Sequence, residues 1–191
     1  MKKSLIVILV ILVILLASIG KGVKMYNGFI SLEEGVDAQW AQVENVYQRR
    51  MDLIPNLVNT VKGYAAHESE TLTAVVEARA KATQTNVSGD NMAQFQENQA
   101  ALTSALSKLM VVVEKYPDLK ANQNFMQLQS QLEGTENRIS TERRRYNEVC
   151  KSYNTQIRQF PKSFIANMAG LEKKDYFEAD KEAEKAPEVN F

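Results

Sequence analysis

The stretch VDAQWAQVENVYQRRMDLIPNLVNTV, residues 36–61, determines the fold expected for this chain. Its larger side chains recur at alternating steps of four and three residues, which places them along one side of an α-helix. Such a heptad seam is typical of a helix that packs lengthwise against other helices. The seam positions are Val36, Trp40, Val43, Tyr47, Arg50, Ile54, Leu57 and Val61. We therefore expect a helix over about residues 29–62, with Gly63 as its stop.

The same periodicity predicts three further helices, over about residues 65–82, 91–115 and 119–159. Residues 85–90 have the composition of a loop, Pro117 and Pro161 end the third and fourth helices, and Asp118 is expected to cap the fourth. The side chains expected to point inward are Leu72, Val75, Val76 and Ala80 in the second helix; Leu102, Ala105, Leu106, Leu109, Val113 and Tyr116 in the third; and Phe125, Leu128, Leu132, Thr135, Ile139, Glu142, Tyr146, Val149, Tyr153 and Phe160 in the fourth.

The composition favours an all-α fold. Glycine (8) and proline (4) are scarce, whereas all-β folds need many of both at their turns. Lys and Arg number 23, as do Asp and Glu, so no net positive charge attracts nucleic acid. Cys150 is the one cysteine, which excludes an intramolecular disulfide, and His67 is the one histidine, which excludes a site built on two imidazoles.

An apolar run near the N-terminus predicts a membrane anchor. A helix over residues 5–19 is about 22 Å long, so residues 20–25 must complete a hydrocarbon core of about 30 Å, with Lys21 and Lys24 reaching the head groups and Tyr26 at the interface. The anchor is expected to consist of Leu5, Ile6, Val7, Ile8, Leu9, Val10, Ile11, Leu12, Val13, Ile14, Leu15 and Leu16.

A cleaved signal peptide is the alternative interpretation of this run. Ser18-Ile19-Gly20 is a tolerable cleavage triplet, but it is weaker than Ala-x-Ala, so we favour a retained anchor. The positive-inside count compares Lys2, Lys3 and the α-amine with Lys21 and Lys24, and it leans by one charge toward an exported domain. We thus divide the chain into an anchor (1–25), a helical domain (26–161) and a C-terminal tail (162–191).

A polar segment inside the first soluble helix is the main candidate for a site. Pro55 is expected to kink that helix and to free a backbone carbonyl, and Arg50 occupies a seam position where its charge needs a partner. The functional hypothesis is a pocket formed with Asp52 and Asn56, used by a cryptic enzyme. The competing and favoured hypothesis is a structural polar network that fixes helix register, in which Arg50 pairs with Glu136 or Glu142.

Other chemical motifs have simpler structural interpretations. The sequence around His67 is a poor metal site and is expected to start a solvated helix, and Cys150 is expected to be a small core residue. The three consecutive arginines at 143–145 have Glu142 and Glu148 beside them, which partly cancel their charge and favour a solvated face over a nucleic-acid surface. We therefore expect no metal and no cofactor.

Several segments resemble the bacterial LemA family, and the resemblance covers nearly the whole chain after the anchor. These segments are RRMDLIPNLV (49–58), VKGYAAHE (61–68), YPDLKAN (116–122), ENRI (136–139) and RRYN (144–147), followed by Tyr153-Asn154, Phe160-Pro161 and Tyr176-Phe177. The chain departs from the family pattern at residues 31–35 and 168–171, which bears on local contacts only.

The resemblance implies an N-terminal transmembrane helix followed by an antiparallel four-helix bundle with long first and last helices, in a bacterial inner membrane. It implies no enzymatic activity and favours a cytoplasmic domain, against the charge count above. We expect a membrane-anchored scaffold that acts through protein–protein contacts and forms homo-oligomers, including large ones. The alternative is an adaptor or regulator of another membrane protein, such as a protease or a sensor.

Overall fold

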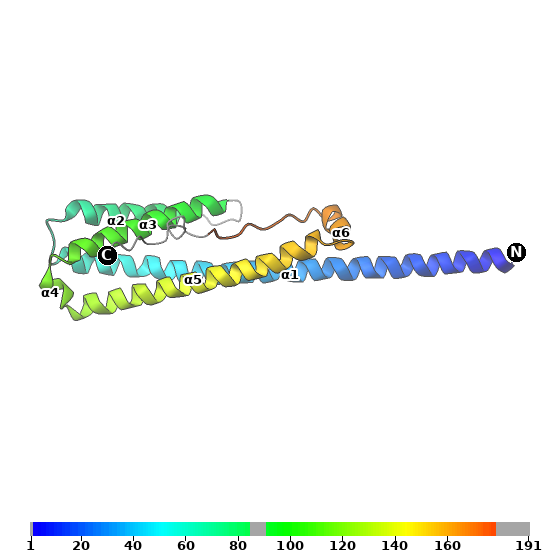
Figure 1. Cartoon of the computed structure of the whole chain (residues 1–191), viewed down its shortest axis with the longest axis horizontal. Coiled ribbons are helices and arrows are strands. Elements are labelled where there is room, and N and C mark those ends of the chain that lie inside the picture. The colour runs from blue at the N-terminus through cyan, green and yellow to red at the C-terminus, as the bar shows by residue number, and fades with distance from the viewer. Residues whose placement is uncertain (1, 85–90, 179–191) are drawn as a thin grey trace, which may run out of the picture. The chain divides into compact units, whose positions relative to one another are not determined.

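The computed structural model describes residues 2–84 and 91–178, and every regular element in these ranges is a helix (Figure 1). In chain order they are α1 (Lys2–Lys62), α2 (Ser69–Gln84), α3 (Met92–Val113), α4 (Pro117–Lys120), α5 (Gln123–Arg158) and α6 (Lys162–Met168). The predicted all-α fold with a long N-terminal helix is confirmed: α1 has 61 residues, and α5 is the second long helix with 36.

Helix α1 differs from the expected helix at its start. The sequence predicted an anchor and then a helix from about residue 29, whereas α1 runs from Lys2 to Lys62 without a break. Residues 20–28 contain three glycines, yet nothing polar interrupts the helical hydrogen bonds, so the two predicted helices merge. The predicted end at Lys62 is confirmed.

The chain divides into two compact units. Unit 1 comprises Met1–Trp40 and Tyr146–Lys174, and unit 2 comprises Ala41–Arg145 and Asp175–Phe191. Both α1 and α5 have residues in each of the two units.

The core of unit 2 is apolar and draws on five helices. The seam of α1 is buried as predicted, with Ile54, Leu57 and Val61 fully inaccessible. Helices α2 and α3 pack side by side against each other. Residues from α2 to α5 complete the cluster: Leu72, Val75, Ala82, Leu102, Ala105, Leu106, Leu109, Val113, Leu119 and Phe125. Burial of such aliphatic side chains contributes about 1.5–3 kcal/mol each, which makes this cluster the main stabilising feature of the unit.

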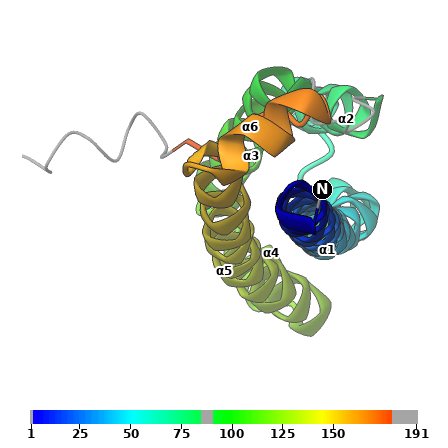
Figure 2. The same cartoon turned by 90° about the vertical axis from the view of Figure 1, so that its right-hand side faces the viewer.

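In unit 1 the aromatic side chains of α5 meet α1. The rings of Trp40 and Tyr146 lie 5.1 Å apart in an edge-to-face arrangement, and Tyr153 and Cys150 are fully buried. Helix α6 lies across the direction of α1, as the two views in Figures 1 and 2 show together. Gly170 has a φ of +68°, which lets the chain turn back after α6 into an extended segment over residues 171–178.

Four local predictions were wrong. Val76 is 51% exposed and Phe160 is 91% exposed, although both were expected to point inward, and Ala80 is also exposed. The cap of α5 is Asn122 and not Asp118: its Oδ1 accepts a hydrogen bond from the Phe125 amide at 3.1 Å. Asp118 lies inside the extra short helix α4, which Pro117 begins because its fixed φ suits a first turn.

The expected loop at 85–90 and the extended end at 186–191 lie outside the described residues.

Candidate functional site

A buried arginine joins three helices of unit 2. Arg50 is only 4% exposed. Its Nη2 donates a hydrogen bond to Thr103 Oγ1 in α3 at 2.7 Å, and its Nη1 lies 3.3 Å from Glu136 Oε2 in α5. The Thr103 hydroxyl in turn donates a hydrogen bond to the carbonyl oxygen of Gln99 at 3.0 Å. We call Arg50, Thr103 and Glu136 the Arg50 cluster; the planar guanidinium contacts both neighbours at once through two different nitrogen atoms.

The structure places the other residues of the predicted network elsewhere. Asp52 is exposed and accepts a hydrogen bond from Gln48 of the same helix at 2.8 Å. Asn56 is exposed, and its backbone carbonyl accepts from Thr60. Glu142 accepts from Arg145 of its own helix at 2.7 Å. Of the two carboxylates that the sequence offered to Arg50, Glu136 is therefore the one in contact.

Pro55 creates a second polar feature one turn further along α1. Proline has no amide proton, so the carbonyl of Met51 lacks the helical donor that residue 55 would supply. Arg79 of α2 supplies a donor instead, because its Nε lies 2.9 Å from the Met51 oxygen. Nothing in the spacing of Arg79 within α2 indicated this contact, which only the packing of α2 against α1 creates.

A polar clasp in unit 1 was not predicted at all. The backbone of Lys174 makes two hydrogen bonds with the buried Asn154 side chain, one donated by the Lys174 amide (2.9 Å) and one accepted by its carbonyl (2.8 Å). The Lys174 ammonium lies 2.8 Å from Glu33 of α1 and 5.8 Å from the centre of the Tyr153 ring. Glu33, Tyr153, Asn154 and Lys174 are named the Lys174 clasp, which ties the extended segment 171–178 to α1 and α5.

The contacts within the Lys174 clasp shift the pKa values of Tyr153 and Lys174. Burial raises the pKa of the Tyr153 phenol, and the neighbouring Glu33 carboxylate raises it further. Burial lowers the pKa of Lys174, but the hydrogen bond and the charge of Glu33 outweigh this, so the Lys174 pKa ends above its usual 10.5. Both groups thus remain protonated near neutral pH, which suits a structural contact and not proton transfer.

The end of the extended segment is held in unit 2. Phe177 is 5% exposed and packs edge-on to Phe95 with a centroid separation of 6.4 Å, while the Arg143 guanidinium lies 5.1 Å from the centre of its ring. Arg143 also donates to the carbonyl of Glu178 at 2.7 Å. The sequence placed Arg143 on a solvated face; the ordered tail explains its different role.

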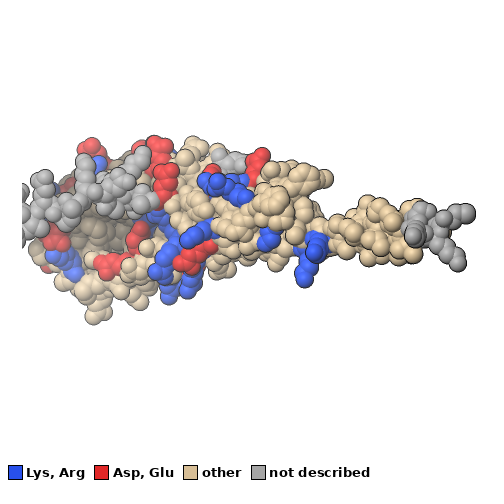
Figure 3. All heavy atoms as spheres, turned by 45° about the vertical axis from the view of Figure 1, so that its right-hand side comes forward, with Lys and Arg blue, Asp and Glu red and all other residues tan. Residues whose placement is uncertain are grey.

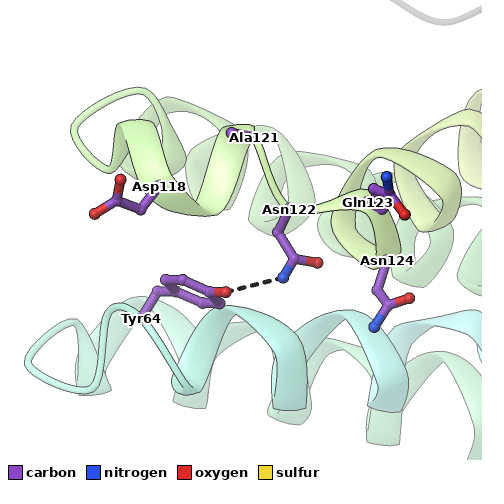
Figure 4. Close-up of a pocket in the computed structure, with 6 residues that line it drawn as sticks. All are labelled: Tyr64, Asp118, Ala121, Asn122, Gln123 and Asn124. Carbon is purple, nitrogen blue, oxygen red and sulfur yellow. Dashed lines mark hydrogen bonds between the residues drawn. The ribbon is translucent and has the colours of Figure 1, made fainter.

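An open hollow lies beside α4. It has a volume of about 510 Å³, is wide open to solvent, and is lined by polar side chains (Figure 4). Asn122 Nδ2 donates to the Tyr64 hydroxyl across it at 2.9 Å. Small-molecule sites are enclosed and mostly apolar, which this hollow is not. In residues 2–84 and 91–178, no group of three His, Cys, Asp or Glu side chains is placed to hold a metal ion.

The remaining candidate is the apolar end of α1. The side chains of residues 5–16 are 49–66% exposed, and this part of α1 is the one helix in the described residues that is long and apolar enough to cross a membrane. Figure 3 shows the described part of this apolar stretch without charged side chains, with Lys or Arg side chains next to the end that continues into the rest of the helix. The hydroxyl of Ser18 donates to the Ile14 carbonyl at 2.8 Å, so the one polar side chain of residues 5–19 is satisfied within the helix.

These features define a membrane-associated helical protein. The chain belongs to the LemA family, because the model of that family matches residues 39–191. The resemblance noted from the motifs is thereby confirmed.

Curated relatives carry two kinds of name. The chain is similar to "Magnetosome protein MamQ 2" of Paramagnetospirillum magneticum (26% identical over 175 residues, covering 80% of this chain and 64% of the relative). It is also similar to "Magnetosome protein MamQ" of Magnetospirillum gryphiswaldense (23% identical over 174 residues, 80% and 64%) and to "Protein LemA" of Metamycoplasma hominis (25% identical over 137 residues, 72% and 61%). The chain thus spans less than two thirds of the length of these relatives, and none of the names denotes a reaction.

Proposed function

We propose that this protein is a single-pass membrane scaffold, which acts through contacts with other proteins and with copies of itself and catalyses no reaction. The observation that carries the proposal is the continuity of α1. One helix passes from an exposed apolar segment into the buried seam that starts at Val36, so a membrane-embedded segment and a protein-packing segment are joined without a loop.

Retention of the anchor is part of the proposal. A signal peptide is cleaved in an extended stretch, whereas residues 17–22 lie inside an unbroken helix and Ser18 is hydrogen-bonded within it. In a bilayer every polar group must be satisfied internally, and this helix meets that condition. We place the anchor in the bacterial cell membrane, with the domain on the outer side as the lysine count favours.

The domain that the anchor carries is proposed to be an antiparallel four-helix bundle formed by α1, α2, α3 and α5. The five-helix apolar core and the side-by-side packing of α2 and α3 support this arrangement. The Arg50 cluster would fix the relative register of α1, α3 and α5, since buried polar contacts of this kind select one alignment of helices over its neighbours.

Self-assembly is proposed to occur through the anchor and to extend to large homo-oligomers. In lipid, helices associate by close packing of small and branched side chains. The Val, Ile and Leu side chains of residues 5–16 are all available for such packing, and Gly20 has open space around it. Gly22 instead faces Ile165 of the same chain.

The composition of the purified particle tests the proposal. The full chain, extracted in mild detergent and purified by a C-terminal tag, should contain this polypeptide alone. A foreign protein in a fixed ratio would contradict self-assembly and support an adaptor or regulator of another membrane protein. For the enzyme hypothesis built on Arg50, Asp52 and Asn56, the discriminating result is an activity that alanine substitution abolishes while the unfolding temperature stays unchanged.

A further inference from the structure

Exposed apolar side chains of unit 1 gather in two places only, as far as its described residues show. One is α1 over residues 5–30, and the other is the short stretch 160–168 that contains α6. In the second place Phe160 is 91% exposed, Phe164 68% and Met168 76%. Phe164 and Met168 are four residues apart in α6 and therefore share one face of it. Three large exposed side chains thus lie within nine residues of the chain, unlike the apolar residues scattered singly over most surfaces.

Helix α6 is held against α1 just beyond the apolar run. The Cδ1 atom of Ile165 lies 3.9 Å from the position that a Cβ on Gly22 would occupy, and Ala166 is fully buried. A Cβ at Gly22 would thus lie in ordinary van der Waals contact with Ile165, which shows that α6 packs against α1 at this level. After α6 in the chain, the Lys174 clasp fixes the backbone to α5 and α1. The residues that follow α6 are therefore also held within unit 1.

The depth of this contact follows from the length of the anchor. A hydrocarbon core of about 30 Å takes roughly 20 helical residues, so a span that starts at Leu5 ends near Lys24. Gly22 lies in the last turn of that span, and Ile165 packs at the same level. Helix α6 is therefore at the boundary between acyl chains and head groups when the anchor crosses the bilayer.

The direction of α6 is also that expected of a helix at the boundary between acyl chains and head groups. Figures 1 and 2 together show α6 crossing the direction of α1, so it lies in the plane of a membrane that α1 spans. Amphipathic helices at this depth bury an apolar face and keep polar and basic groups on the water side. Lys21 and Lys24 are exposed next to the contact, and Lys162 at the start of α6 donates to Gln156. Lysines in this position meet lipid phosphates.

We propose that α6 is an interfacial membrane helix, which inserts Phe160, Phe164 and Met168 into the bilayer surface beside the anchor. The proposal rests on the membrane anchoring proposed above and adds a second, lateral contact with lipid. That contact is continuous with the lipid-facing surface of α1, and it would set the tilt and rotation of unit 1 on the membrane.

The test uses the full chain in vesicles of phosphatidylcholine and phosphatidylglycerol, with an environment-sensitive fluorophore on a single introduced cysteine. Cys150 is replaced by alanine in every variant. The probe positions are Phe164→Cys for α6, Val10→Cys for the anchor, and Val111→Cys as the matched control in α3, where the native side chain is 66% exposed, close to the 68% of Phe164. Far-UV circular dichroism and an unchanged unfolding temperature in detergent verify folding.

We expect the probe at 164 to emit at shorter wavelength than the probe at 111, to be quenched by lipids labelled near the head group, and to resist aqueous iodide. Iodide quenching at 164 equal to that at 111, with the probe at 10 protected, would overturn the inference and leave the anchor intact. Iodide quenching at 10 as well would contradict the anchor itself. A probe at 164 shielded from both iodide and labelled lipid would show that a second copy covers α6, which also overturns the lipid contact.

Discussion

Arg79 Nε donates a hydrogen bond to the carbonyl oxygen of Met51 at 2.9 Å, in the position where the missing amide of Pro55 would otherwise have served. The proline that breaks a hydrogen bond inside α1 thus creates an acceptor for α2. A residue that weakens one helix thereby specifies how a second helix packs on it.

This relationship predicts that substitutions at positions 55 and 79 have non-additive effects on the free energy of unfolding. Arg79→Ala should lower the free energy of unfolding by about 1–3 kcal/mol, because the part-buried Met51 carbonyl loses the donor that replaces the missing Pro55 amide. In a Pro55→Ala background the restored amide can reach Met51, so the same substitution should cost clearly less. Urea unfolding of the four proteins in the cycle measures the difference. Equal costs in both backgrounds would show that the two residues act independently.

The Arg50 cluster predicts an asymmetric response to substitution. Arg50→Ala should destabilise by about 2–3 kcal/mol, because it opens a cavity where three helices meet. Glu136→Gln should cost less than about 1 kcal/mol, since its side chain is 52% exposed and water can replace the contact.

Arg50→Met is the matched control, because it keeps the side-chain volume without the charge. It should stay within about 1.5 kcal/mol of the parent protein in thermal unfolding. If Glu136→Gln instead proved as costly as Arg50→Ala, the ion pair and not the packing would dominate, against this account.

The Lys174 clasp predicts a loss of stability at alkaline pH. A lysine whose pKa is raised on folding stabilises the fold fully below its unfolded value, and this contribution disappears as the pH rises through the folded value. The raised pKa of Tyr153 acts in the same direction, because only the unfolded phenol ionises near its usual 10.0. Stability should therefore fall above pH 10.

The loss of stability is measured by calorimetric unfolding of the parent protein and of Lys174→Met between pH 8 and 11. Both proteins are kept in the same detergent. The parent should lose more stability across this range than the variant, whose clasp has no ammonium to titrate. Identical alkaline losses in both proteins would place the titrating group elsewhere.

Phe177 predicts that the ordered tail contributes to unit 2. Phe177→Ala should cost about 3 kcal/mol, as for other buried phenylalanines, since it removes the ring from Phe95 and from the Arg143 guanidinium. Phe164→Ala is the matched control with the same change at an exposed position. In detergent it should leave the unfolding temperature unchanged. Amide exchange at residues 175–178 should quicken in the first variant only.

Local periodicity was enough to predict the helices and the buried seam of α1, because the spacing of Val43, Ile54 and Leu57 reports on one helix alone. The sequence did not indicate which partner each polar residue meets. Lys174 lies 20 residues from Asn154 and 141 from Glu33, and only the tertiary fold brings them together.

Two errors have different physical origins. Val76 lies one position beyond the buried Val75 in an alanine-rich helix, where the small side chains leave the facing direction ambiguous. Phe160 continues the heptad spacing of α5, but α5 ends at Arg158, so the spacing no longer places this ring on the seam.

The native mass of the full chain in mild detergent, measured beside a shortened chain that begins at Tyr26, tests the membrane scaffold most directly. The proposal predicts a homomeric particle of several or many copies for the full chain and a much smaller species for the shortened one, because the exposed helix over residues 5–19 supplies the contacts between copies. A full chain that is monomeric, or an assembly that survives removal of the anchor unchanged, would contradict it.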